Sequence, residues 1–327
     1  MLVTGPNGVG KTNLLEALHV GSQGFSPRTR AEPRLVRFGE AAARVRLAGA
    51  QGGAAFETEV DLAPPSPKNI RLNGAPLAGG EELRLRLSAL AFTPDRLAVV
   101  KGGPLVRRTY LDRMLGRLYP VRANLSSDYA RALAQRNAAL RRARTGESSL
   151  DAVDPWTEQV VVLGDELDRA RAELVSVLAP GFRTHSGALG LEDAALVYEE
   201  RGLSAAELAE RLDRDLERGT TGAGPHLRDA TIAAGERELR AFGSQGEQRT
   251  AVLALVLAEA DLLAERHGEP PLLLLDDVFS ELDRTRGEAL LAQLPAGGQA
   301  VVTATERPGM IEPDLVVEVR PGEARAA

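Results

Sequence analysis

Apolar and polar positions follow two different patterns along this chain. Towards both ends, short apolar runs alternate with amphipathic segments, which indicates strands separated by helices. Between residues 105 and 178 the apolar positions recur at helical spacing instead, as Leu111, Leu115 and Leu118 do. The segments with strand character are residues 43–47, 56–62, 87–92, 272–275, 300–302 and 315–319. These patterns predict an α/β protein interrupted by a helical segment.

The order of these segments suggests how the chain divides. A chain of 327 residues is longer than most single domains, so two lobes are expected. Residues 1–100 and 222–327 would form an α/β head, lobe I. Residues 101–221 would form a helical arm, lobe II, inserted into the head.

A phosphate-binding loop lies close to the N-terminus. The stretch from residue 5 to residue 12 fits the pattern G-x-x-x-x-G-K-[ST], and the segment after it reads as a helix. Lys11 would neutralise the β- and γ-phosphates and assist catalysis, while Thr12 would bind Mg²⁺. All eight residues are candidate nucleotide contacts: Gly5, Pro6, Asn7, Gly8, Val9, Gly10, Lys11 and Thr12.

Two acids follow the apolar run at residues 272–275, which is a Walker B pattern. A buried strand of this kind delivers carboxylates to the edge of the sheet where the phosphates bind. Asp276 is expected to hold Mg²⁺, directly or through water. Asp277 is expected to polarise the attacking water. The two motifs together predict a nucleotide site for ATP and Mg²⁺.

A third motif, at residues 242–249, resembles the signature turn of ABC-type ATPases. A hydroxyl and backbone N–H groups at a helix start form an anion site, and the helix is expected over residues 247–266. Ser244, Gly246 and Gln248 are the candidate contacts. In ABC-type ATPases this turn caps the γ-phosphate held by the other subunit, so we expect an ATP-dependent homodimer.

Composition limits the cellular setting. The chain has no cysteine, which favours a reducing cytoplasm. The longest apolar stretch, residues 251–263, contains two acids and is too short to span a bilayer, so no membrane partner is expected. The net charge of −6 does not by itself indicate a nucleic-acid-binding protein.

The distribution of arginine is more informative than the net charge. Residues 130–145 hold several arginines and no acid. Guanidinium groups suit phosphate contacts, although a solvated helix face explains a single cluster about equally well. The DNA-contact candidates are Arg136, Arg141, Arg142 and Arg144. Further groups are Arg28, Arg30, Arg34 and Arg37, and Arg107, Arg108, Arg113, Arg117 and Arg122.

Taken together, the motifs resemble the RecF family over almost the whole chain. The family's order of P-loop, helical arm, signature and Walker B is present here. The residues that carry the resemblance are Ser26-Pro27-Arg28-Thr29, Leu35-Val36-Arg37-Phe38-Gly39, Gly103-Pro104, Arg107-Arg108, Tyr110-Leu111-Asp112, Tyr129, Gln135-Arg136-Asn137, Ser244-Gln245-Gly246, Leu274-Leu275-Asp276-Asp277-Val278 and Leu282-Asp283.

This resemblance implies a fold and a function. The fold would be an ABC-type P-loop ATPase head with an inserted helical arm. The function would be ATP-dependent DNA binding in recombinational repair and replication restart. An ATP-driven dimer would bind single-strand/double-strand junctions, hydrolyse ATP slowly and promote recombinase loading together with RecO and RecR.

Two departures from the family pattern stand out. The family usually reads Gly-Pro-His-Arg-Asp-Asp where this chain reads Gly224-Pro225-His226-Leu227-Arg228-Asp229, which leaves the role of the acid pair open. The family also begins with a β-hairpin before the P-loop, whereas only residues 1–4 precede it here. We therefore expect a late recorded start or a truncated paralogue that lacks this hairpin.

Three other functions compete with this interpretation. An ABC-type transporter ATPase, or another ABC ATPase that does not act on DNA, shares the motifs but not the large helical insert. A GTPase is disfavoured because no Asn-Lys-x-Asp motif occurs. A non-enzymatic DNA clamp overlaps with the favoured function. The sequence does not identify the glutamine that senses the γ-phosphate, since neither Gln23 nor Gln51 is convincing. It also does not decide whether Thr303 or Thr305 replaces the histidine found at the switch position of many ABC ATPases.

Overall fold

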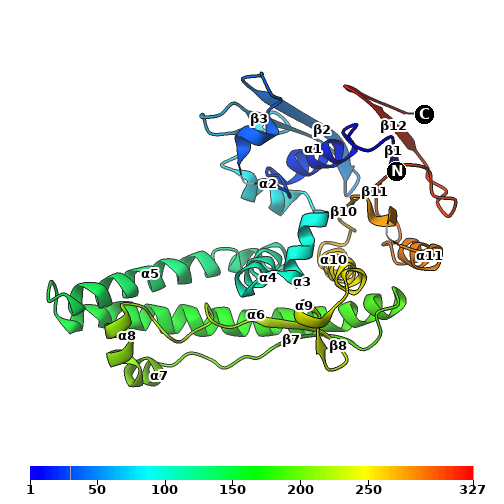
Figure 1. The fold of residues 1–327 in the computed structure, drawn as a ribbon. Coiled ribbons are helices and arrows are strands. Elements are labelled where there is room, and N and C mark those ends of the chain that lie inside the picture. The colour runs from blue at the N-terminus through cyan, green and yellow to red at the C-terminus, as the bar shows by residue number, and fades with distance from the viewer. Residues whose placement is uncertain (30, 281, 327) are drawn as a thin grey trace. The chain divides into compact units, whose positions relative to one another are not determined.

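The computed structural model describes residues 1–327 except 30, 281 and 327. The chain forms two compact units (Figure 1). The head comprises Met1–Leu97, Gly181–Glu192 and Gly243–Ala327. The arm comprises Ala98–Pro180 and Asp193–Phe242. The first boundary lies close to the predicted one, whereas residues 181–192 and 222–242 belong to the opposite unit from the one expected.

Long-range contacts explain both differences. Helix α6 (Asp154–Ala188) is continuous, and its end carries His185, whose ring nitrogens bond Asp261 at 2.6 Å and Gln293 at 2.8 Å. Residues 222–242 join the arm because strand β8 (Ala230–Ala234) pairs with strand β7 (Ala194–Tyr198). These partners are distant in sequence, so no local sequence pattern predicts the contacts between them.

The head is built around a six-stranded sheet with the order β13-β12-β1-β11-β10-β6. All neighbours are parallel except β12 and β13. The strands are β1 (Leu2–Thr4), β6 (Ala89–Phe92), β10 (Leu272–Leu275), β11 (Ala300–Ala304), β12 (Val316–Arg320) and β13 (Glu323–Ala326). Parallel strands are buried on both faces, which explains their continuous apolar runs.

Helix α1 (Lys11–Gln23) joins this sheet to a second, antiparallel one. Leu15 packs in one core with Val3 and Leu274, whereas Val20 packs in another with Val60. The second sheet has the order β2-β3-β4-β5, with β2 (Ala43–Gln51), β3 (Ala54–Leu62), β4 (Asn69–Leu72) and β5 (Ala75–Pro76). α1 is therefore anchored on two sides, which fixes the P-loop at its start.

The remaining helical segments of the head are short, with one exception. Helix α10 (Gln245–His267) is long, and nearly every residue of its middle part is buried. The others are η1 (Glu32–Leu35), α2 (Gly80–Arg86), η2 (Pro94–Leu97), η5 (Val278–Ser280) and α11 (Arg284–Ala292).

The arm is mainly helical, as predicted. Its elements are α3 (Ala98–Lys101), α4 (Pro104–Leu118), η3 (Pro120–Arg122), α5 (Leu125–Arg144), η4 (Leu150–Val153), most of α6, β7, α7 (Ala205–Glu210), α8 (Leu212–Arg218), β8, β9 (Arg237–Glu238) and α9 (Leu239–Phe242). The antiparallel order β7-β8-β9 forms a third small sheet. None of the helices in the described part of the chain combines the length and apolar character needed to cross a bilayer.

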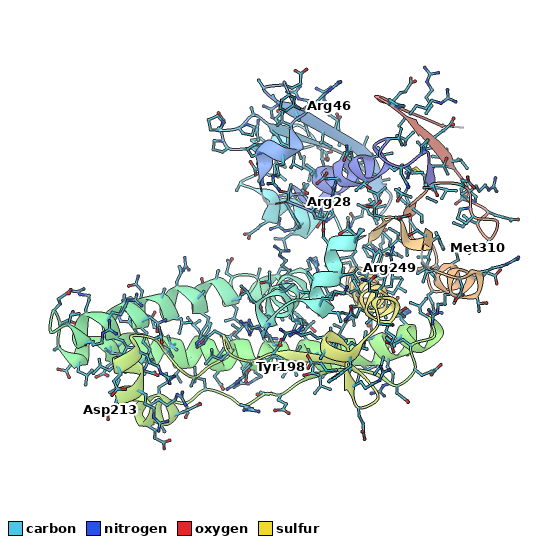
Figure 2. The ribbon with its side chains drawn as sticks, in the orientation of Figure 1. Arg28, Arg46, Tyr198, Asp213, Arg249 and Met310 are labelled. Carbon is cyan, nitrogen blue, oxygen red and sulfur yellow. The ribbon has the colours of Figure 1, made fainter. Side chains whose placement is uncertain are left out.

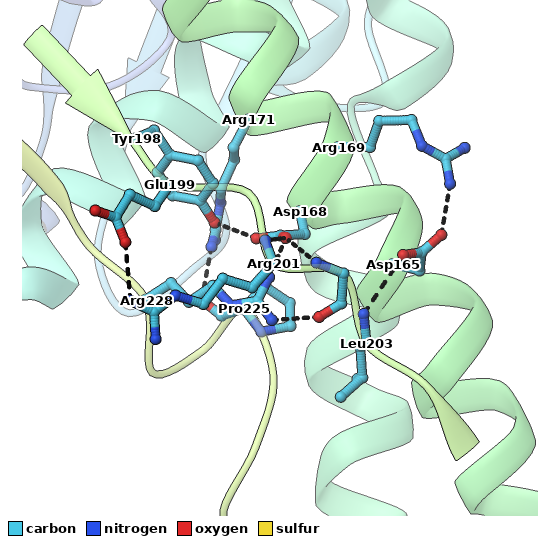
Figure 3. Close-up of polar contacts among 11 residues, drawn as sticks. Asp165, Asp168, Arg169, Arg171, Tyr198, Glu199, Arg201, Leu203, Pro225 and Arg228 are labelled. Atoms are coloured by element: carbon cyan, nitrogen blue, oxygen red, sulfur yellow. Dashed lines mark hydrogen bonds and ion pairs between the residues drawn. The ribbon is translucent and has the colours of Figure 1, made fainter. Parts of the chain in front are cut away.

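Buried ion pairs hold the arm together. Asp168 on α6 is fully buried, and burial by itself would raise the pKa of its carboxyl. Hydrogen bonds from Tyr198, the Arg201 N–H and Arg228 outweigh this effect, so the pKa of Asp168 is lowered (Figure 3). Asp229 accepts from Arg107 Nε at 2.9 Å. Arg228, which departs from the family pattern, and Asp229, which matches its last acid, therefore both serve the internal structure of the arm.

Candidate functional site

The P-loop follows the central strand β1 and ends at α1. Gly5 has φ +150°, and a Cβ there would lie 2.6 Å from the carbonyl oxygen of Val319, so no larger residue fits. Gly10, at φ +115°, is the N-cap residue of α1. α1 has neither a side-chain cap nor an acid in its first turn. The positive end of the helix and its N–H groups are therefore available to an anion.

Lys11 and Thr12 lie at the end of this loop. Lys11 Nζ donates to the carbonyl oxygens of Gly5 at 2.7 Å and Pro6 at 3.0 Å, so the ammonium group lies across the loop. Thr12 Oγ1 donates to Asp276 Oδ1 at 3.1 Å. This hydrogen bond connects the P-loop with the strand that was predicted to lie beside it.

The two acids after β10 have different surroundings. Asp276 is 4% exposed, and its Oδ1 accepts from Thr12 and from Thr303 Oγ1, the latter at 2.8 Å. Asp277 is half-buried and has φ +50°, a left-handed conformation that costs an L-residue on the order of 1 kcal/mol. The buried acid suits a metal ligand, and the more accessible acid suits a role towards water or substrate.

A small cavity beside Asp276 tests whether Mg²⁺ fits. It has a volume of about 10 Å³, which is room for one water molecule, and Thr12, Thr93 and Asp276 contribute to its lining. Thr93 Oγ1 is buried and has no hydrogen-bond partner among the described residues. Such a set of oxygen donors fits a hard cation, which commonly keeps several waters and binds phosphate oxygens too.

The charged ligands of this site are few. In the described part of the chain, no three His, Cys, Asp or Glu side chains gather where they could hold a metal ion on their own. Magnesium ions in nucleotide sites are usually held by one or two carboxylates together with water and phosphate oxygens.

The signature turn is exposed at the start of α10. Ser244 is the N-cap residue of a capping box: its Oγ accepts from Glu247 N at 3.2 Å, and its N–H donates to Glu247 Oε2 at 2.7 Å. The hydroxyl proton of Ser244 is not used in this box, and Gly246 is exposed. Ser244 and Gly246 are thus fixed in position yet open to an external anion.

Gln248 differs from the other two signature candidates. Its side chain is 4% exposed because it lies on the inner face of α10. A residue so buried does not share the surface formed by Ser244 and Gly246. Its burial separates Gln248 from the exposed pair, and its nucleotide contact stays a prediction.

The four arginines predicted to contact DNA also include both buried and exposed residues. Arg136 is 1% exposed and bonds Asp215 Oδ2 at 2.9 Å, Thr221 at 2.7 Å and Thr157 at 3.0 Å. The prediction that it contacts DNA is thus replaced by a structural role, because the side chain is buried and its Nε and Nη1 donors bind interior partners.

The other three arginines of this cluster remain candidates. Arg141, Arg142 and Arg144 are exposed at the end of α5. Arg141 donates to the carbonyl oxygen of Gly219 and Arg144 to that of Glu217, which leaves most of their donors to solvent.

The two other arginine groups also differ from each other. Arg107 and Arg108 are committed to Asp229 and to the carbonyl oxygen of Arg228. In the group after α1, Arg28 (labelled in Figure 2) lies on the head. It pairs with Glu16 at 3.3 Å, and Arg34 and Arg37 are exposed. Arg30 lies outside the described residues.

The structure also bears on the residues left open by the sequence. Gln23 is buried and donates to the carbonyl oxygens of Ser22 and Leu87, so it supports the head rather than a phosphate. Thr305 is exposed beyond β11, whereas Thr303 bonds Asp276 directly. The motifs did not indicate Thr93, which belongs to no recognisable spacing. They also did not indicate a role for Arg249, which ends the signature motif but was not among its candidate contacts.

Comparison with curated proteins identifies close relatives. The chain is 39% identical over 329 residues to a DNA replication and repair protein RecF of Anaeromyxobacter sp., covering 95% of this chain and 87% of the relative. It is 36% identical over 337 residues to RecF of Symbiobacterium thermophilum, covering 98% and 88%. No protein-family model matches the chain.

Solved structures agree with these relatives. A recombination mediator protein RecF with ATP, described as part of the RecFOR pathway, has a TM-score of 0.86 and 28% identity, covering 100% of this chain and 91% of that one. An Smc head has a TM-score of 0.57 at 16% identity, which supports the fold alone. The predicted ABC-type head with a helical arm is confirmed, and the chain belongs to the RecF family of DNA replication and repair proteins.

Proposed function

We propose that this protein binds DNA in an ATP-dependent manner during recombinational repair and replication restart. The observation that carries the proposal is the hydrogen bond between Thr12 and Asp276, because it joins the phosphate-binding loop to the acid expected at the metal. The family's role in replication and repair supports the DNA part, and the ATP complex of a RecF structure supports the nucleotide.

The residues of the head have separate roles towards ATP. Lys11 would exchange its contacts with Gly5 and Pro6 for phosphate oxygens, and the N–H groups at the start of α1 would bind the same phosphates. Thr12 and Asp276 would hold Mg²⁺, which neutralises the phosphate charge. Asp277 would accept a proton from the attacking water, as a general base.

The exposed signature turn supports an ATP-driven homodimer. Ser244 can donate its hydroxyl proton, and Gly246 its N–H, to a phosphate held by a second copy of the chain. Each nucleotide would then lie between two heads. In this arrangement hydrolysis limits the lifetime of the dimer, so a slow ATPase can act as a timer.

Replacing Ser244 tests the dimer. Ser244→Arg is expected to abolish ATP-induced dimerisation while nucleotide binding by the monomer changes less than about twofold, because a bulky cation would occupy the space for the partner's nucleotide. Light scattering with and without ATP and Mg²⁺ measures this. Ser127→Arg, at an exposed serine in the first turn of α5, is the matched control. A dimer that forms without ATP, or persists in the Ser244 variant, would contradict the proposal.

DNA binding by an acidic chain requires a local concentration of positive charge. The exposed arginines at the end of α5, Arg141, Arg142 and Arg144, provide one such place. Dimerisation would present two copies of this surface to one DNA molecule. By resemblance to the family, the preferred DNA would be a single-strand/double-strand junction, with RecO and RecR as partners in loading the recombinase.

Replacing these three arginines with glutamine tests the DNA surface. We expect weaker binding and a shallower salt dependence, since log affinity falls by roughly 0.9 per neutralised phosphate for each decade of salt. The matched control changes three exposed, ion-paired arginines of the arm, Arg131, Arg169 and Arg201, to glutamine. Fluorescence anisotropy of labelled DNA over a salt series measures the affinity and the salt dependence of each variant. Equal losses in the two variants would mean that only net charge matters.

A transporter ATPase is less well supported. Its motifs would be the same, but the arm and the sequence relatives fit a repair protein better. Co-purification with a membrane protein would favour the transporter, whereas ATP turnover stimulated by DNA would favour the proposed function.

A further inference from the structure

Two side chains hold the backbone of Asp277 from opposite sides. Its N–H donates to Thr303 Oγ1 at 2.8 Å, and its carbonyl oxygen accepts from an Arg249 guanidinium nitrogen at 2.6 Å. The residue between these contacts has the left-handed φ of +50°. Strained backbone of this kind persists where the surroundings over-determine it. We propose that Thr303 and Arg249 form a clamp that positions the Asp277 carboxylate for hydrolysis.

Thr303 joins the two acids. It lies in β11, opposite Val3 of β1 in the register of the sheet, and is 1% exposed. Its hydroxyl accepts from Asp277 N and donates to Asp276 Oδ1. Only a side chain that both donates and accepts can make these two bonds. One hydroxyl group therefore contacts both acids of the Walker B pair.

Arg249 ties Asp277 to the signature helix. It is labelled in Figure 2, lies on α10 five residues after Ser244 and is 5% exposed. Its guanidinium lies 5.5 Å from the ring centre of Phe92. The carbonyl oxygen of Phe92 in turn accepts from Asp276 N at 2.9 Å. A displacement at the start of α10 would therefore reach the backbone of Asp277 through a single side chain.

This clamp rests on the proposed function, in which Asp277 is the base, and extends it. In the proposed dimer, Ser244 faces the partner's nucleotide while Asp277 of the same subunit faces its own. Arg249 then connects the two nucleotide sites. Contact between Ser244 and the second nucleotide would complete the positioning of Asp277, so that hydrolysis waits for the dimer.

Removing the polar group of either clamp side chain, Thr303 or Arg249, tests the proposal. Thr303→Val and Arg249→Met should each lower kcat on the order of 10- to 100-fold, because misplacing a catalytic group by about 1 Å has such effects. Binding of a fluorescent ATP analogue should change less than about twofold. Thr303→Ser, which keeps the hydroxyl, should recover most of the turnover. Thr231→Val, at an exposed threonine in strand β8 of the arm, is the matched control.

The same changes made in an Asp277→Asn background separate this role from a structural one. If the clamp acts through Asp277, Thr303→Val should add no further loss there, since residues that act as a unit are not additive. A further loss, or normal turnover in both single variants, would overturn the clamp alone. Unchanged turnover in Asp277→Asn itself would overturn the assignment of the base, and the clamp with it.

Discussion

Asp277→Asn is expected to slow ATP turnover by about 10²–10⁴-fold, the usual cost of removing an oriented general base. Nucleotide and Mg²⁺ binding should remain, because Lys11, Thr12 and Asp276 are unchanged and the amide keeps the shape of the carboxylate. The ATP-bound dimer should consequently persist on DNA. Single-turnover hydrolysis and dissociation from labelled DNA measure the two effects.

Two further variants define what this result means. Lys11→Ala should lose nucleotide affinity instead, since its ammonium group is the mobile cation of the P-loop. Asp213→Asn, at an exposed acid of α8, should leave turnover unchanged. Wild-type turnover in Asp277→Asn would place the base elsewhere.

Arg136→Ala is expected to destabilise the arm by about 3–5 kcal/mol, because it leaves a buried carboxylate without its partner. Asp215, the partner, is 1% exposed and also accepts from Gly222 N at 2.9 Å. Urea unfolding followed by the fluorescence of Trp156, which packs in the arm core with Leu140 and Val153, measures the loss.

An exposed pair on the same helix provides the control. Arg131 bonds Asp128 at the surface, so Arg131→Ala should cost only about 0.2–1 kcal/mol. Replacing both buried partners, as in Arg136→Met with Asp215→Leu, should restore much of the stability. Normal stability of Arg136→Ala together with weakened DNA binding would return Arg136 to the DNA surface.

The nucleotide site could be anticipated because its chemistry is encoded in local spacing. Gly5, Gly10, Lys11 and Thr12 form one loop, and Asp276 ends an apolar strand. Once both are recognised, the parallel sheet requires their carboxyl ends to meet at one edge. The hydrogen bond from Thr12 to Asp276, which spans 264 positions, realises this expectation.

Burial of arginine could not be anticipated in the same way. Arg136 and Arg142 lie on one helix, yet one is interior and the other exposed. The difference is made by α8, which places Asp215 against α5 from 79 positions away. Helical periodicity shows which positions share a face, but not whether a charged face meets solvent or a matching charge.

The amino-acid sequence by itself determined the family, the order of head, arm and head, and the loop and strand that meet at the phosphates. These features depend on residue types at short spacing along the chain, because such spacing sets local backbone conformation and apolar periodicity. Only the tertiary structure showed that residues 181–192 belong to the head and residues 222–242 to the arm. It also decided the burial of Arg136 and Gln248, and the contacts of Thr303 and Arg249 with Asp277. Their partners lie far away in sequence, so only packing brings them together.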